Sequence, residues 1–269
     1  MSRIGFVGAG RMGRPMVERL VRDGHDVQVL ARSDEADDAL TGIGAHPVRR
    51  LADVAADADI VIVCVFTDAQ VHEVCLDETF LSALPAGAVL VVHTTISPDT
   101  VEAVAGRAAA FGVDVVDAAV SGGPHDIAAG RLTLFVGGAD DTVARVRPVL
   151  GSYGDPVFHV GRLGNGLCVK LVNNALFAAN IGLISEAVRL GGQLGVDESA
   201  LLEALPHGSS ASRVMGNIAA RGSVAAFTSA VGEFLDKDVA VVRSVAAELG
   251  GELGVLLDAI EAQPKVPSV

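Results

Sequence analysis

Short apolar runs and amphipathic patterns alternate along the first 160 or so positions of this 269-residue chain. The apolar runs are rich in β-branched residues, which is typical of buried strands, while the segments between them repeat apolar residues at helical spacing. The predicted strands are 3–7, 25–30, 59–66, 88–93, 113–118, 132–136 and 157–160. The predicted helices are one that ends near Gly24 and those at 68–75, 98–110 and 140–150. This alternation predicts an α/β region with a doubly wound parallel sheet.

From Gly164 onward the strand patterns stop. Residues 167–194 are apolar nearly all round, which indicates a long helix buried on most sides, and further helices are predicted at 197–205, 212–220, 231–249 and 252–262. We therefore expect an α/β domain at 1–162 and an all-α domain at 163–269, joined by the long helix. The tail 263–269 contains two prolines and is predicted to be disordered.

A glycine-rich turn follows the first strand directly. It reads Gly8, Ala9, Gly10, Arg11, Met12, Gly13, and a helix and a second strand come after it. Strand, turn, helix and strand form the context that a dinucleotide-binding fingerprint requires. The first glycine permits the tight turn, the second lets a pyrophosphate approach the backbone, and the third allows helix and strand to pack closely. The region is therefore predicted to be a Rossmann domain that binds a nicotinamide dinucleotide at the helix N-terminus.

The end of the second strand indicates which dinucleotide is preferred. An acidic residue there would bind the ribose 2′-hydroxyl of NAD, whereas an arginine would accommodate the 2′-phosphate of NADP. The strand ends without an acid and continues into Arg32 and Ser33, which can both donate to a phosphate. Asp34 and Glu35 follow and oppose that preference. We expect NADP, with NAD as the alternative.

Ligands of doubly wound sheets bind at the carboxyl ends of the strands. The residues there that we expect to contact the cofactor are Val65, Phe66, Thr67, Thr94 and Thr95. A third loop, Ser121-Gly122-Gly123, exposes backbone N–H groups that suit an anionic ligand. A plain glycine-rich turn is the alternative interpretation of that loop.

Lys170 stands out within the long apolar helix. The chain has seventeen arginines and only three lysines, at 170, 237 and 265. Lysine can lose its proton near neutral pH and arginine cannot, so a catalytic role is one interpretation and a lysine that snorkels from a helix face is the other. Asn174 lies four residues on, hence on the same helix face, with Asn173 beside it. Polar groups on so apolar a helix need partners or a cleft, and we expect a cleft between the two domains.

The composition limits which classes of partner and which cellular compartment are expected. The net charge of −13 argues against nucleic acid and an anionic membrane as partners, and the longest strictly apolar run, 60–66, is far shorter than the roughly 20 residues of a membrane span. No room for a signal peptide precedes the first strand, and the odd number of cysteines, Cys64, Cys75 and Cys168, favours reduced thiols. We expect a cytoplasmic protein without a metal site.

Taken in order, these segments resemble the β-hydroxyacid dehydrogenases, the group of 3-hydroxyisobutyrate dehydrogenase and tartronate semialdehyde reductase that is related to 6-phosphogluconate dehydrogenase. The matching segments are GFVGAGRMGRPM at 5–16, TTISP at 94–98, the segment 117–138, GNGLCVKLVNN at 164–174, and the pair Lys237-Asp238. Together they span almost the whole chain.

The resemblance implies an NADP-preferring oxidoreductase of a small β-hydroxyacid or its semialdehyde. It implies that Lys170 acts as general acid and base and that Asn174, with Asn173, holds the substrate. Ser121, Gly122 and Gly123 would bind the substrate carboxylate, and Lys237 would lie near the cofactor. The family also implies a homodimer or homotetramer. An imine reductase, which Lys170 disfavours, and a cofactor-binding sensor without catalysis are the alternatives.

The chain departs from the family pattern in several places. Asp126-Ile127 replaces the usual Gly-Ala pair after His125, and His93 stands where an acid is common. The first change is expected to alter substrate choice or to stiffen the loop, and the second to be a structural replacement. The C-terminus is shorter than is usual in the family, which is expected to affect the pocket and the oligomeric state.

Overall fold

The computed structural model describes residues 1–248 and 250–263 and divides into two compact units. The first unit is Met1–Lys170 and the second begins at Leu171, so the division falls inside the long helix α9 (Asn165–Gln193). The boundary expected between 162 and 163 stays a prediction. Apart from Gln263, the tail predicted to be disordered lies outside the described residues.

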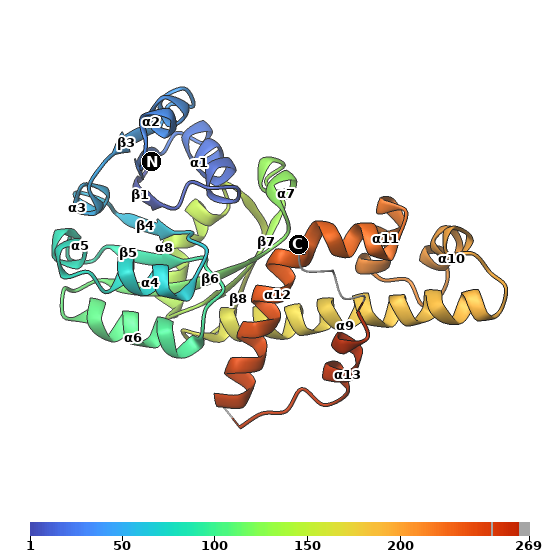
Figure 1. Ribbon diagram of the computed structural model, residues 1–269. Coiled ribbons are helices and arrows are strands. Elements are labelled where there is room, and N and C mark those ends of the chain that lie inside the picture. The colour runs from blue at the N-terminus through green and yellow to red at the C-terminus, as the bar shows by residue number, and fades with distance from the viewer. Residues whose placement is uncertain (249, 264–269) are drawn as a thin grey trace. The chain divides into compact units, whose positions relative to one another are not determined.

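The first unit is built on one eight-stranded sheet with the strand order β3-β2-β1-β4-β5-β6-β7-β8 (Figure 1). Its strands are β1 (Arg3–Val7), β2 (Asp26–Leu30), β3 (His46–Val48), β4 (Ile60–Val63), β5 (Val89–Val92), β6 (Asp114–Ser121), β7 (Leu132–Gly137) and β8 (Gly154–Gly161). Its complete helices are α1 (Gly13–Arg22), α2 (Asp34–Thr41), α3 (Leu51–Ala55), α4 (Asp68–Cys75), α5 (Glu78–Ala83), α6 (Pro98–Ala109), α7 (Pro124–Ala128) and α8 (Asp140–Leu150).

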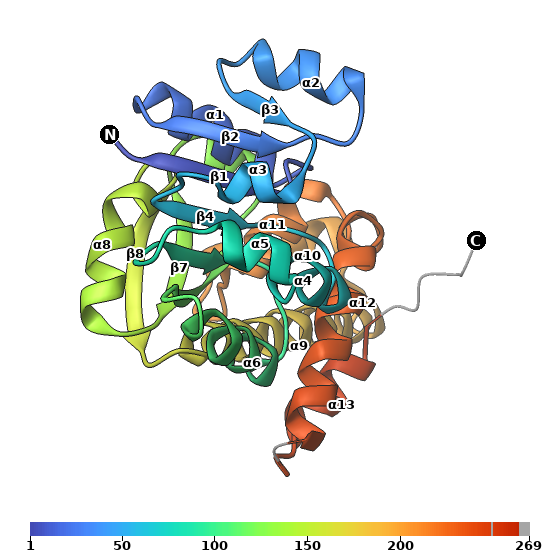
Figure 2. The same ribbon diagram turned by 90° about the vertical axis from the view of Figure 1, so that its left-hand side faces the viewer.

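Helices cover both faces of this sheet. One core packs α1, α7 and α8 against it, and the other packs α3, α4, α5 and α6 against the opposite face (Figure 2). The central strands β4 and β5 are buried at every position, which explains why their sequences are continuous apolar runs instead of alternating patterns. The predicted doubly wound arrangement is therefore confirmed.

The sheet is not wholly parallel, and here the sequence-based expectation was wrong. β6 pairs with β7 in antiparallel register, with Asp117 opposite Gly137, while the other neighbouring strands are parallel. The connection 122–131 holds only the five-residue helix α7. A parallel crossover needs a dozen or more residues, usually including a full helix, so this short segment turns the chain back.

The described residues of the second unit form helices joined by turns and loops, without a strand, as predicted. After the remainder of α9 come α10 (Glu198–Ala204), a 3₁₀ turn (Leu205–His207), α11 (Arg213–Arg221), α12 (Val224–Glu248) and α13 (Val255–Glu261). Its core includes Ile181, Ile218, Phe227 and Ile260. A side chain at Gly182 would overlap the Ala259 carbonyl oxygen, so the glycine allows α9 and α13 to touch backbone to backbone.

α9 also qualifies the expectation about membranes. Among the described residues it is the one helix long and apolar enough to cross a bilayer, with a mean hydropathy of 1.6 in its most apolar window. Lysine and asparagine interrupt the strictly apolar run, but the mean of the window still reaches that of a candidate span. Half of the window is buried inside the protein, and core helices pass the same test, so this is weak evidence for a membrane span.

Candidate functional site

The glycine turn between β1 and α1 has the geometry of a phosphate-binding loop. Gly8 has a φ of +102°, and a side chain there would overlap the Cys64 carbonyl oxygen. A side chain at Gly13 would overlap the carbonyl oxygen of Gly8. Gly10 is different, because a β-carbon there would meet nothing within 4 Å. Two glycines are thus required by the fold itself, and the third leaves open space over the backbone.

The N-terminus of α1 is available for an anion. Met12 precedes the helix in helical backbone conformation, no side chain caps the first turn, and that turn contains no acidic residue. The Arg14 N–H donates to the Gly10 carbonyl oxygen at 3.0 Å and Pro15 has no N–H, so it is the positive end of the helix dipole that favours a phosphate at this position. The predicted residues Gly8, Ala9, Gly10, Arg11, Met12 and Gly13 therefore form one loop directly before the helix.

A cavity of about 570 Å³ opens at the carboxyl end of β2. Arg32 lines it, and so does Arg49, which the sequence reasoning missed because it follows a short strand that was not predicted. The Arg49 guanidinium contacts the carboxylates of Asp34 and Asp37 in α2. Ser33 is the N-cap of α2 and its hydroxyl accepts the N–H of Ala36 at 3.2 Å. Two arginines at this cavity suit a phosphate, and two acids partly offset them.

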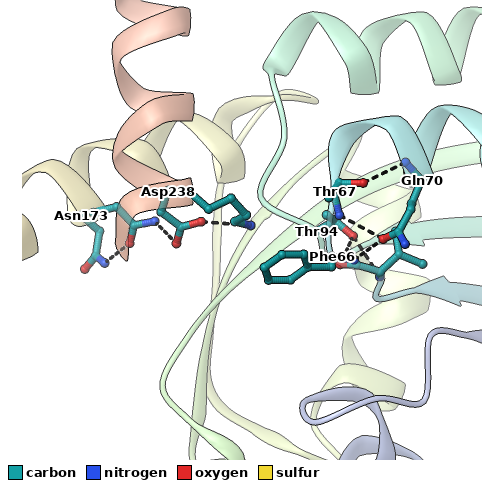
Figure 3. A network of polar contacts seen from close by, with 9 residues as sticks. Phe66, Thr67, Gln70, Thr94, Asn173 and Asp238 are labelled. Carbon is teal, nitrogen blue, oxygen red and sulfur yellow. Dashed lines mark hydrogen bonds and ion pairs between the residues drawn. The ribbon is translucent and has the colours of Figure 1, made fainter. Parts of the chain in front are cut away.

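The loops after β4 and β5 are tied together by side chains (Figure 3). The Thr94 hydroxyl accepts the N–H of Val65 at 3.1 Å and donates to its carbonyl oxygen at 3.0 Å. The Gln70 side-chain oxygen accepts the N–H groups of Phe66 and Thr67, at 2.9 and 3.1 Å, while the Thr67 hydroxyl caps α4. The strand-end loop is therefore fixed, with the Phe66 ring 41% exposed and Thr95 partly exposed.

His93, just before these threonines, is buried and fully hydrogen-bonded. Its Nδ1 donates to the Ala118 carbonyl oxygen at 2.5 Å, and its Nε2 accepts the Tyr153 hydroxyl at 2.8 Å. Burial lowers the pKa of His93 to about 4. The imidazole is neutral at physiological pH, and its bonds connect β5, β6 and the segment before β8 in the interior of the first unit.

The substrate loop predicted from the sequence begins at Ser121, the last residue of β6. Gly122 has a φ of +135°, a conformation that favours glycine. The N–H of Gly123 donates to the Asp126 carboxylate at 2.8 Å, and His125 Nε2 lies 3.3 Å from the same carboxylate. One of the N–H groups expected to face the substrate therefore already has a partner inside the loop.

Asp117, whose role the sequence reasoning missed, anchors the helix that carries Lys170. It is fully buried on β6, and its two carboxylate oxygens accept the N–H groups of Gly164 and Leu167, at 2.7 and 2.8 Å. Burial raises its pKa, and the backbone N–H bonds oppose that shift. The available signal was an acid within an apolar strand, which must find donors. Lys170 follows Leu167 by three residues and is partly buried.

The second unit holds a separate polar network (Figure 3). Asn174 is only 5% exposed, and its amide nitrogen donates to Asp238 at 2.8 Å. The Asn173 amide donates to the Asn174 side-chain oxygen at 3.2 Å, and Lys237 Nζ lies 3.1 Å from Asp238. The network joins α9 to α12, so it brings the predicted Asn173, Asn174 and Lys237 together through an aspartate.

Comparison with known families accounts for nearly the whole chain. Residues 3–161 match the NAD-binding domain of 6-phosphogluconate dehydrogenase, and residues 164–262 match the NAD-binding domain of NADP-dependent 3-hydroxyisobutyrate dehydrogenase. The two matches follow one another in the order expected from the sequence motifs.

Individual relatives support the same family assignment. The chain is 36% identical to 3-hydroxyisobutyrate dehydrogenase of Pseudomonas aeruginosa, over 78% of this chain and 70% of that protein. A structure of Mycobacterium tuberculosis 3-hydroxyisobutyrate dehydrogenase with L-serine superposes with a TM-score of 0.86 at 28% identity, covering 97% and 92% of the two chains. An imine reductase from Pseudomonas sp. shares the fold, with a TM-score of 0.68 at 21% identity over 96% and 99%. The chain belongs to the β-hydroxyacid dehydrogenase family and is a nicotinamide-dependent oxidoreductase acting on CH–OH or C=O groups.

Proposed function

We propose that this enzyme interconverts a small β-hydroxyacid and its semialdehyde, with NADP as the preferred cofactor. The nicotinamide, when bound, supplies or accepts the hydride. Support comes from the open turn over Gly10 and from the family to which the chain belongs. The P. aeruginosa relative is named for a small hydroxyacid of this class.

Lys170 is the proposed general acid and base. Reduction builds negative charge on the carbonyl oxygen, and the Lys170 ammonium donates its proton to that oxygen; in the reverse direction the neutral amine accepts the proton. Such a positioned transfer contributes typically ~10²–10⁴-fold to the rate. The observation that carries this assignment is the Asp117 anchor, since the residue that holds the first turn of α9 lies on the strand that ends at Ser121.

The proposed substrate site uses Ser121, Gly122 and Gly123, with Asn174 and Asn173 holding the substrate near Lys170. Asn174 lies four residues after Lys170 on α9, so both side chains point from one face of the helix. The bond to Asp238 supports this role, because it fixes the orientation of the Asn174 amide. Lys237 is proposed to contact the cofactor, with Asp238 limiting its freedom.

The preference for NADP rests on the cavity beside Arg32 and Arg49. Guanidinium groups bind phosphate through charge-assisted hydrogen bonds, and the 2′-phosphate is what distinguishes NADP from NAD. Asp34 engages Arg49 in the structure, which supports a role for the α2 acids in orienting that arginine instead of repelling the cofactor.

We also propose a homodimer or homotetramer that works in the cytoplasm. Large apolar side chains are exposed along α9, with Val172, Leu176, Leu183 and Leu190 each between 47% and 60% exposed. Such a stripe suits a subunit contact. The three cysteines are free thiols, as a reducing compartment would require. Light scattering coupled to size exclusion would measure the subunit number, and a monomer at micromolar concentration would contradict the oligomer.

The decisive experiment compares wild type with Lys170→Ala and the matched variant Lys170→Arg, which keeps the charge but cannot transfer the proton. The chain has no tryptophan and one tyrosine, so NADPH and NADH fluorescence titrations are clean. Turnover of a panel of semialdehydes should fall by roughly 10²–10⁴-fold in both variants while the NADPH Kd stays within about twofold.

The same panel separates the alternatives. A cyclic imine reduced in preference to every semialdehyde would favour an imine reductase. Cofactor binding without turnover of any compound, unchanged in Lys170→Ala, would identify a sensor. Unaltered semialdehyde turnover in both variants would remove Lys170 from the mechanism.

A further inference from the structure

The loop between β6 and α7 contains a carboxylate of its own. Asp126 folds back so that one carboxylate oxygen accepts the N–H of Gly123 at 2.8 Å, and its side chain is only 12% exposed. The Asp126 backbone is held as well, because its N–H donates to the Gly123 carbonyl oxygen at 2.9 Å and its carbonyl accepts the N–H of Arg131 at 2.8 Å.

The surroundings keep this carboxylate in place. A β-carbon at Gly122 would lie 2.8 Å from the same oxygen and 3.0 Å from Leu132, so the chain passes close against it. The next residue, Ile127, is fully buried in the core that includes residues of α1. His125 Nε2 lies 3.3 Å away with its side chain 82% exposed, and it offsets the negative charge only when protonated.

The arrangement changes what the loop can offer a ligand. Ser121 keeps its hydroxyl and Gly122 its N–H, but the Gly123 N–H is already engaged. The charge that engages it lies beside the remaining donors, in a partly buried position where screening by water and salt is reduced. Asp126 repels every negative charge on the ligand, but a first carboxylate is compensated by the two remaining donors, whereas an additional negative charge has no such compensation in the loop.

We infer that Asp126 is a specificity-determining residue that makes this enzyme select monoanionic substrates over dianionic ones by taking the Gly123 N–H and setting a negative charge beside the substrate loop. The inference rests on the proposed function of that loop. The substrate class is then a monocarboxylate whose other end is neutral, a hydrocarbon or hydroxyl group, instead of a dicarboxylate or a phosphorylated acid.

Butyrate and succinate form a matched pair of probes, because they have similar length and differ by one negative charge. Their binding to the NADPH-loaded protein can be followed by the fluorescence of the bound cofactor. In wild type, the Kd of succinate should be at least about tenfold higher than the Kd of butyrate, a difference of about 1.4 kcal/mol in binding free energy.

Asp126→Asn keeps an acceptor for the Gly123 N–H and removes the charge, so it should tighten succinate about tenfold and butyrate by no more than about threefold. Asp126→Ala also frees the N–H and should tighten both ligands further. Asp141→Asn, an exposed acid in the first turn of α8, is the control of equal charge change and should alter neither. Thermal unfolding and NADPH affinity report whether each variant is folded.

An unchanged succinate-to-butyrate ratio in Asp126→Asn would overturn the inference, and so would the absence of carboxylate binding in wild type and both Asp126 variants. Because binding is read without turnover, these outcomes differ from failure of the proposed function. That failure would appear as no oxidation or reduction of any hydroxyacid or semialdehyde by a protein that still discriminates the two probes.

Discussion

The glycine turn of the first unit and the polar network of the second are built in opposite ways. The turn lies within six consecutive residues, and its geometry depends on missing side chains at Gly8 and Gly13. The network depends on side chains that are present, and the Asn174–Asp238 bond joins residues 64 positions apart. Neighbouring residues alone specify the first kind of site, whereas the second kind forms only after α9 and α12 have packed.

The two kinds of site should also respond differently to substitution. In the turn, the cost of a change is set by backbone atoms that cannot move away, so neighbouring glycines can have very different tolerances. In the network, the cost is set by which polar atom is left without its partner.

Within the turn, Gly13→Ala and Gly10→Ala should separate folding from binding. The first places a methyl group on the Gly8 carbonyl oxygen and should lower the free energy of unfolding by about 3 kcal/mol or more. The second meets open space and should change stability by less than about 0.5 kcal/mol, yet weaken NADPH by roughly tenfold or more because the pyrophosphate needs that space. Denaturant unfolding and NADPH fluorescence measure both. Similar destabilisation by the two variants would contradict the assignment.

His93 shows that a network of the second kind also exists inside the first unit, and it should appear as acid sensitivity. Its pKa is about 4 in the folded protein, against the ordinary histidine value of 6.5, so between these pH values the unfolded chain binds more protons. The stability it contributes is complete above about pH 6.5 and is lost as pH falls, at up to ~1.4 kcal/mol per pH unit and about 3 kcal/mol in total.

Unfolding free energies measured from pH 7.5 to 4 check this. His93→Gln should be less stable at neutral pH. Its unfolding free energy should also depend less steeply on pH in that window, by an amount that corresponds to the uptake of about one proton on unfolding. An unchanged slope in His93→Gln would mean that other groups cause the acid sensitivity.

A double-mutant cycle tests the Asn174–Asp238 bond. Asn174→Ala leaves a partly buried Asp238 oxygen without its donor and should cost about 1–3 kcal/mol, whereas the double variant with Asp238→Ala should cost less than the sum of the single changes. Asn180→Ala, which removes a bond to the Leu176 carbonyl oxygen of the same helix, should show no coupling to Asp238→Ala. Additive costs at Asn174 would contradict the network.

The smallest effect concerns the two arginines of the cofactor cavity. Arg32→Ala should weaken NADPH by about tenfold and NADH by less than twofold, since one charge-assisted bond to a phosphate is worth about 1.5 kcal/mol. Arg49→Ala should weaken NADPH less, because two carboxylates already share that guanidinium. Equal loss of both cofactors in Arg32→Ala would refute the preference for NADP.

Local patterns were sufficient for much of the fold. Helices α4 and α8 begin and end at the predicted residues, and α6 begins at the predicted Pro98. Long runs of one periodicity leave little choice of element. The missed elements are short, such as α2, whose sequence DEADDALT has few apolar positions, and α7, whose five residues cannot show a helical repeat.

Local sequence was enough for the glycine turn, the order of the longer strands and helices, and the long apolar helix with Lys170, because each depends on neighbours within a few residues. The antiparallel β7, the anchoring of α9 by Asp117 and the partner of Asn174 depend instead on how distant segments pack. A buried polar group must find a partner, but only packing determines which donor or acceptor comes within reach.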